Sequence, residues 1–117
     1  MKPERWGGRA IGRSHTVARG DMVWSVSNAV TAGADFETQV QETLAFLDAS
    51  LEKAGSSRQR LLSVQVLLTD IARREQFDTQ WCAWIGEDPQ HWPQRAVLEA
   101  ALAPGLEIEL VVTAYRG

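Results

Sequence analysis

The chain has 117 residues, of which 44% are hydrophobic and 23% charged, which predicts one globular domain spanning residues 1–117. Its net charge of −3 disfavours a surface that follows nucleic-acid phosphates. No apolar run of about 18 residues is present to span a membrane, and the N-terminus lacks the apolar core of a signal peptide. We therefore expect a cytoplasmic protein that binds neither nucleic acid nor a membrane. The single cysteine, Cys82, excludes an internal disulfide and is interpreted as a small helix residue.

The first part of the chain predicts a β-hairpin. Residues 14–18 and 22–27 have the character of short strands, and Gly20-Asp21 supplies the turn between them. Residues 1–12 are rich in glycine, which leaves two readings open. They are either loosely ordered or add an edge strand.

The clearest helix is predicted over residues 36–54. Asp35 is placed to cap its N-terminus, and Gly55 to end it. One apolar stripe runs along this helix at spacings of four, four, three and four residues, as expected for a face that packs on a core. The stripe consists of Phe36, Val40, Leu44, Leu47 and Leu51.

A strand and a second helix are predicted next, over residues 61–69 and 73–85. Alternation along the strand puts one set of apolar side chains on the same face. These are Val64, Val66 and Leu68. Large aromatic side chains gather on one side of the helix. These are Phe77, Trp81 and Trp84.

Two further strands are predicted at the end of the chain, one beginning after Arg95 and one over residues 106–114, with a break at Pro104-Gly105 between them. The resulting order is β-β-α-β-α-β-β. It favours an α+β sandwich in which two helices cover one face of a mixed sheet. The other sheet face is left open, and we expect it to be buried by oligomerisation because its outward positions are apolar. Among these positions are Leu67, Val97 and Val111.

A candidate anion site is predicted from the last two strands. Arg95 stands near the start of one strand, and Glu107 and Glu109 share one face of the next. If these strands pair or lie close together, a guanidinium that binds carboxylates stands near an acid that can hold water. A metal site is not expected, because His15 and His91 match no ligand spacing.

Four segments of the chain, in this order and spacing, resemble the Rid family of reactive-intermediate deaminases, also called YjgF or L-PSP. They are residues 51–57, 64–70, 81–84 and 93–95, with the glutamate-containing last strand. The resemblance covers residues 14–115, and the paired tryptophans are similar to the YoaB-type branch. It implies a chorismate-mutase-like fold and a homotrimer with active sites between subunits. It also implies hydrolysis of 2-imino acids to 2-oxo acids and ammonia, without a cofactor or metal.

The resemblance assigns roles to the residues of the candidate site. The substrate-carboxylate arginine of the family matches Arg95, although a structural salt bridge with Glu99 is the alternative. The family also uses a glutamate of the last strand to hold the attacking water. If the last strand is aligned with the family by counting back from residues 111–114, Glu109 takes the position of this glutamate. If the preceding turn is aligned with a longer deletion, Glu107 takes it instead.

The predicted pocket wall departs from the family pattern. The first-strand tyrosine has no counterpart near Arg13 and Ser14. On the second strand, Ser25, Val26 and Ser27 stand near the place of a Ser-Gly pair. Asp78 stands in place of an asparagine, and Val97 in place of a cysteine. Trp92 lies in a loop that is longer than the family pattern. Trp92 either covers a substrate or packs against the helix. Trp24 faces either the sheet core or a subunit seam.

These departures leave two hypotheses for function. The first is an enzyme that deaminates a small 2-imino or enamine carboxylic acid, with a changed substrate or weak activity on common imines. The alternative is a non-catalytic trimeric binding module for a small carboxylate metabolite or a partner protein. Endoribonuclease activity is disfavoured, because the pI is acidic and the sequence shows neither a histidine pair at nuclease-like positions nor a basic groove.

Overall fold

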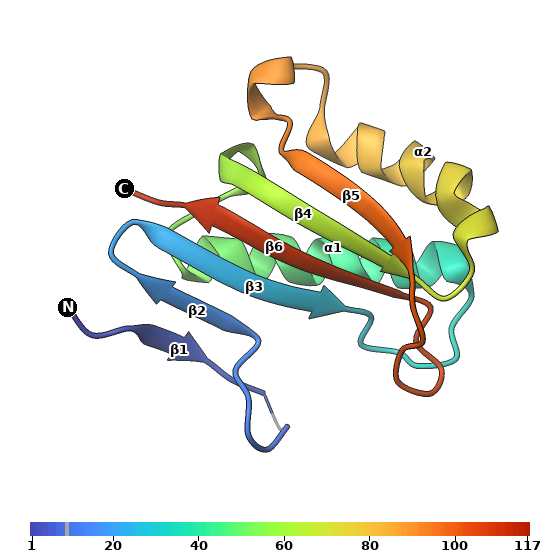
Figure 1. The fold of residues 1–117 in the computed structure, drawn as a ribbon, viewed down its shortest axis with the longest axis horizontal. Helices are drawn as coiled ribbons and strands as arrows, with labels where there is room; N and C mark the ends of the chain where they lie inside the picture. Colours follow the sequence, from blue (N-terminus) through green and yellow to red (C-terminus); the bar gives the residue numbers. More distant parts are fainter. Residues whose placement is uncertain (9) are drawn as a thin grey trace.

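The protein folds around one six-stranded mixed sheet with the strand order β1-β2-β3-β6-β4-β5. A computed structural model describes residues 1–8 and 10–117. Helix α1 crosses behind the sheet and helix α2 lies beside β5, while both termini lie near the turn between β2 and β3 (Figure 1). The α+β sandwich predicted from the sequence is confirmed. Within the described ranges, no helix combines the length and apolar character needed to cross a membrane.

The N-terminal region forms three antiparallel strands rather than the two predicted. They are β1 (Glu4–Trp6), β2 (Thr16–Arg19) and β3 (Met22–Asn28). The edge-strand reading of the glycine-rich segment 1–12 is therefore the correct one for Glu4–Trp6, and Arg9 lies outside the described residues. β1 is held in place because Trp6 packs partly against the core.

Helix α1 (Phe36–Lys53) has the predicted caps and buried stripe. The Asp35 carboxylate accepts a hydrogen bond from the backbone N–H of Thr38 at 2.8 Å. The chain leaves the helix through Gly55, whose φ of +84° lies in the left-handed region. The whole apolar stripe is buried against the sheet.

Strand β4 (Leu61–Leu68) and helix α2 (Arg74–Ile85) agree with the predicted elements to within one residue. Phe77 and Trp81 of α2 are buried, and Trp84 packs against the core from its edge. Three short 3-10 helices occur in the connections. They are η1 (Arg58–Arg60), η2 (Ile71–Arg73) and η3 (Pro89–His91).

Strands β5 (Gln94–Glu99) and β6 (Ile108–Tyr115) do not pair, because β4 lies between them. β5 runs parallel to β4 and forms the edge of the sheet, whereas β6 is antiparallel to β4. The pairing of the last two strands, one condition under which Arg95 and the glutamates of a single chain would meet, is therefore not fulfilled. Pro104-Gly105 sits inside the longer connection 100–107, which does not impose a tight hairpin.

Register decides which side chains share the helix-covered face. Val66 of β4 pairs with Val97 of β5, and both pack on the core side. The prediction that Val97 points outward is therefore wrong. Leu67 and Val111 do lie on the open face, where several apolar side chains are well exposed. The well-exposed ones on its strands are Trp24, Val26, Leu62, Leu98 and Tyr115.

A buried glutamine connects α1 to the segment before β6. Gln39 Nε2 donates to the carbonyls of Ala34 and Gly105 at 2.9 and 2.8 Å, and its Oε1 accepts from the N–H of Glu107 at 2.9 Å. Gly105 has a φ of +82°, and a Cβ there would lie 3.0 Å from the backbone N of Gly33. The position of the glutamate-containing strand is thus fixed by a specific side chain and a specific glycine.

Candidate functional site

A cleft of about 290 Å³ lies between α2 and the start of β5. One helix face supplies Asp78, Trp81, Cys82 and Ile85, which recur at helical spacing. The segment entering β5 supplies Trp92, Pro93 and Arg95. Three of the residues predicted for the site, Arg95, Asp78 and Trp92, therefore meet in one place within a single chain.

Arg95 lies inside β5 rather than before it, and its side chain is 19% exposed. Its Nη1 donates to Asp78 Oδ1 at 2.7 Å. Its guanidinium carbon also lies 5.7 and 5.5 Å from the ring centres of Phe77 and Trp81, in cation–π range. Within the described part of the chain, Nη2 and Nε have no acceptor, so one edge of the guanidinium is available to an anion.

Asp78, not Glu99, is the partner of Arg95. Glu99 instead accepts a hydrogen bond from the backbone N–H of Ile71 at 3.0 Å. Asp78 faces the cleft, and its second oxygen is 4.0 Å from Arg74 Nε. Asp78 therefore already partly neutralises the arginine.

Trp92 stands at the cleft with a fixed ring. Its indole N–H donates to the carbonyl of Gly86 at 2.9 Å, which satisfies its polar atom and leaves the rest of the ring as an apolar wall. The side chain is 54% exposed. Trp92 is thus bonded back to the end of α2 and also lines the cleft.

Glu109 lies on the open side of the sheet, and Glu107 lies just before β6 beside Arg73; neither lines this cleft. Glu109 pairs in register with Asn28 and Leu67, and its Oε1 is 3.3 Å from Asn28 Nδ2. Glu107 Oε1 is 3.6 Å from Arg73 Nη1. Because β4 separates β5 from β6, a single chain does not bring either glutamate to Arg95.

The three predicted pocket residues of β3 point in two directions. Ser25 and Ser27 are buried beneath α1, where Ser27 Oγ donates to the carbonyl of Thr43 at 2.7 Å. Only Val26 reaches the open face that carries Glu109. The fourth wall residue, Val97, packs on the core and does not line the cleft.

A buried polar chain under the hairpin was not expected from the sequence. His15 Nδ1 is 2.7 Å from Thr16 Oγ1, which in turn is 2.7 Å from Ser25 Oγ. Burial, and secondarily the positive charge of Lys53, lower the pKa of His15 below its ordinary value of 6.5. These hydrogen bonds depend on Thr16 and Ser25 lying opposite each other on paired strands, and the sequence alone does not give that register.

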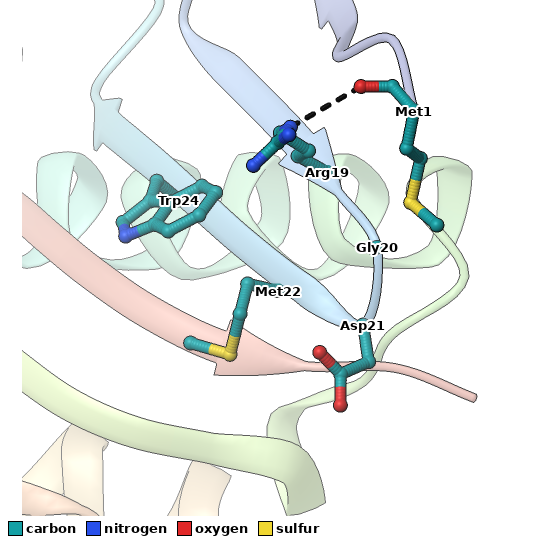
Figure 2. A pocket seen from close by; sticks show the side chains of 6 residues that line it. All are labelled: Met1, Arg19, Gly20, Asp21, Met22 and Trp24. Atoms are coloured by element: carbon teal, nitrogen blue, oxygen red, sulfur yellow. Dashed lines mark hydrogen bonds between the residues drawn. The ribbon is translucent and has the colours of Figure 1, made fainter.

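A second hollow, of about 370 Å³, lies at the β2–β3 turn. Figure 2 shows that Trp24 and Met22 approach it from β3 and that Arg19 reaches toward Met1. Arg19 Nε donates to the Met1 carbonyl at 3.2 Å. This hollow shares Trp24 with the open apolar face and belongs to that surface rather than to the Arg95 cleft. Across the described ranges, no three His, Cys, Asp or Glu side chains converge as metal ligands would.

The family described as endoribonuclease L-PSP matches residues 10–116. A RutC family protein of Haemophilus ducreyi is 33% identical over 81 residues, covering 68% of each chain. The RutC family protein YoaB of Escherichia coli is 33% identical over 82 residues, covering 69% of this chain and 70% of that protein.

Solved structures show the same fold. A member of the YjgF protein family from Neisseria meningitidis superposes with a TM-score of 0.88 at 24% identity, covering 100% of this chain and 97% of that one. The match of nearly the whole sequence, the YoaB-like relatives and this shared architecture agree. The chain therefore belongs to the L-PSP family, also called the Rid or YjgF family.

Proposed function

We propose that the protein hydrolyses a small 2-imino or enamine carboxylic acid to the 2-oxo acid and ammonia. The observation that carries this proposal is the placement of Arg95 at a small apolar cleft, with Nη2 and Nε available to a carboxylate. A guanidinium edge binds a carboxylate through two parallel hydrogen bonds and so fixes the neighbouring C2 atom in one orientation. No cofactor is required for this chemistry.

The reaction needs positioning and a modest base. Arg95 holds the carboxylate, and Glu109 orients a water molecule and takes its proton as the oxygen bonds to C2. In the resulting tetrahedral carbinolamine, the glutamate returns this proton to the amine nitrogen. The C–N bond then breaks as the C2 hydroxyl gives its own proton to the glutamate, which passes it on to solvent, so that the 2-oxo acid and ammonia leave. Because an iminium carbon is already electrophilic, orientation and general-base help are sufficient.

The site is proposed to form between copies of the chain. Arg95 and Glu109 lie on opposite faces of one sheet and are separated by β4, so the glutamate must come from a second subunit. The exposed apolar side chains of the open face supply a surface for such assembly. Together with the family resemblance, this supports a homotrimer with inter-subunit sites.

Glu109 is the better candidate for the water-holding acid. Its carboxylate accepts only a long hydrogen bond from a neutral amide, that of Asn28, whereas Glu107 lies beside the positive charge of Arg73. A carboxylate that already faces a cation has less freedom to orient a water molecule. We expect Glu109→Gln to lower kcat for imine loss by about 100-fold or more, and Glu107→Gln to lower it by less than about threefold.

The test measures both products. The imine 2-iminobutanoate is generated by an amino-acid oxidase, its loss is followed by semicarbazide trapping, and released ammonia is quantified with and without the protein. Acceleration of both signals is expected. If a folded, assembled protein accelerates neither, the proposed enzymatic function is wrong.

The binding-module hypothesis has one observation in its favour. The Asp78 carboxylate already occupies Nη1 of Arg95, which weakens the attraction of the arginine for a substrate anion. Under this hypothesis, 2-oxobutanoate binds to the cleft in calorimetry but imine loss stays at the uncatalysed rate.

A further inference from the structure

We propose that the cleft beside Arg95 selects 2-imino acids with bulky apolar side chains, and that Trp92 determines this preference. This inference rests on the proposed function and names its substrate class. It is carried by the division of the cleft into a polar end and an apolar slot.

The polar end is formed by Arg95 and Asp78, 2.7 Å apart. It suits the common part of every 2-iminium acid, in which a carboxylate and a positively charged nitrogen are attached to the same carbon. Arg95 faces the carboxylate, and the Asp78 carboxylate accepts a hydrogen bond from the nitrogen. This end therefore fixes the head of the substrate without distinguishing one side chain from another.

The apolar slot is formed by Trp81, Ile85 and Trp92, and the exposed Cys82 also lines it. When Arg95 holds the carboxylate, the side chain attached at C2 lies next to this apolar slot. The methyl or ethyl group of the smallest imines leaves most of the roughly 290 Å³ cleft to water. A branched or aromatic side chain displaces that water and buries apolar surface on both partners.

The aromatic walls of the slot are held by contacts within the chain. The Trp81 ring lies 5.9 Å from Phe77 and 5.4 Å from Trp84 between ring centres. The Trp92 ring is held by the hydrogen bond of its indole N–H to Gly86. Rigid aromatic walls discriminate by shape because little ordering entropy is lost on binding.

The experiment compares kcat/KM for imines generated from leucine and from 2-aminobutyrate. For the unmodified protein we expect the leucine-derived imine to be favoured by about tenfold, as two further buried methylene-sized groups imply. Trp92→Ala should bring this ratio close to one, while Trp92→Phe, which keeps an aromatic wall, should retain most of it. Cys82→Phe, which adds bulk to the lining of the slot, should lower the ratio as well.

Affinities of the product 2-oxo acids provide a second readout that does not depend on turnover. Calorimetry should show 4-methyl-2-oxopentanoate binding about tenfold more tightly than 2-oxobutanoate, with the difference lost in Trp92→Ala. Absence of imine loss for every substrate would overturn the proposed function, and the ratio of affinities would then decide the present inference alone. Equal affinities, binding of neither oxo acid, or a ratio unchanged in Trp92→Ala would overturn the inference even if imines are hydrolysed.

Discussion

The charge of Arg95 is shared between Asp78 and any anion that enters the cleft. The pair lies at 2.7 Å, and its side chains are 19% and 32% exposed. An ion pair of this partly exposed kind is worth about 1 kcal/mol or less. It is strong enough to orient the guanidinium and weak enough for a carboxylate to bind beside it.

Neutralising Asp78 should strengthen binding of a simple carboxylate. In Asp78→Asn the amide can still accept a hydrogen bond from Arg95, but the competing negative charge is gone. We expect the Kd for 2-oxobutanoate to fall by about threefold, measured by calorimetry at low ionic strength. Glu87→Gln removes the same charge from the neighbouring loop, and an equal effect there would show that only the net charge of the protein matters.

His15 makes folding stability depend on pH. Its pKa is lowered in the folded protein by burial, so the unfolded chain takes up a proton more readily than the folded one. Stability is therefore full above pH 6.5 and is lost as the pH falls from 6.5 through the lower folded-state pKa. Thermal unfolding between pH 8 and pH 5 should show a smaller decrease in Tm for His15→Asn than for the unmodified protein. Parallel decreases would mean that His15 is not responsible.

At the level of the elements, the connection of α1 to β6 depends on Gln39. Its buried side chain satisfies the carbonyls of Ala34 and Gly105 and the N–H of Glu107. The Gly105 carbonyl also accepts from the N–H of Gly33 at 2.9 Å, whereas the other two groups rely on Gln39, so the side chain holds the loop that leads into the glutamate-containing strand.

Removing this side chain should be costly for folding. Gln39→Leu leaves the carbonyl of Ala34 and the N–H of Glu107 without this partner, and we expect the free energy of unfolding to fall by about 2–5 kcal/mol in urea titrations. Gln41→Leu is the matched control, because Gln41 lies on the same helix and is exposed. Its effect should stay within about 0.5 kcal/mol. Similar stabilities for the two variants would contradict this role of Gln39.

The sequence was sufficient for the helices and strands but not for their neighbours in the sheet. The apolar period of α1 and its caps at Asp35 and Gly55 are local signals, and the structure confirms them. The insertion of β4 between β5 and β6 is a long-range choice that no local pattern contains. Val97 was therefore assigned to the open face, whereas its pairing with Val66 of β4 places it on the core side.

The candidate site was predictable in part for the same reason. Arg95, Asp78 and Trp92 do gather in one cleft, on elements that the sequence placed correctly. Cys82 and Ile85 were not expected there, although their spacing from Asp78 along the helix was a usable signal. The separation of Glu109 from Arg95 became visible only with the sheet order.

At the scale of the whole molecule, the open sheet face is the surface that most needs a partner. Val26 lies on this face, opposite Val111 in register, with 38% of its surface exposed in the single chain. The proposed homotrimer buries this face, so a charge placed there would be desolvated without a partner.

Val26→Asp should therefore dissociate the assembly. In sedimentation experiments we expect the unmodified protein to have the mass of three 13.0 kDa chains and the variant to shift toward one. Val30→Asp introduces the same charge at a loop position that is 74% exposed, and it should leave the mass unchanged. A trimeric Val26→Asp variant would place the subunit interface elsewhere.

The most direct test of the central claim compares two arginine substitutions in the 2-iminobutanoate assay. Arg58 has the same kind of surroundings as Arg95: its Nε donates to Asp48 at 3.0 Å, and its guanidinium carbon lies 4.7 Å from the Trp84 ring centre. Arg58→Ala thus removes an equivalent cluster outside the cleft. Our account predicts that imine loss is accelerated by the unmodified protein and by Arg58→Ala, and that Arg95→Ala abolishes the acceleration while remaining assembled. Full activity of Arg95→Ala would contradict it.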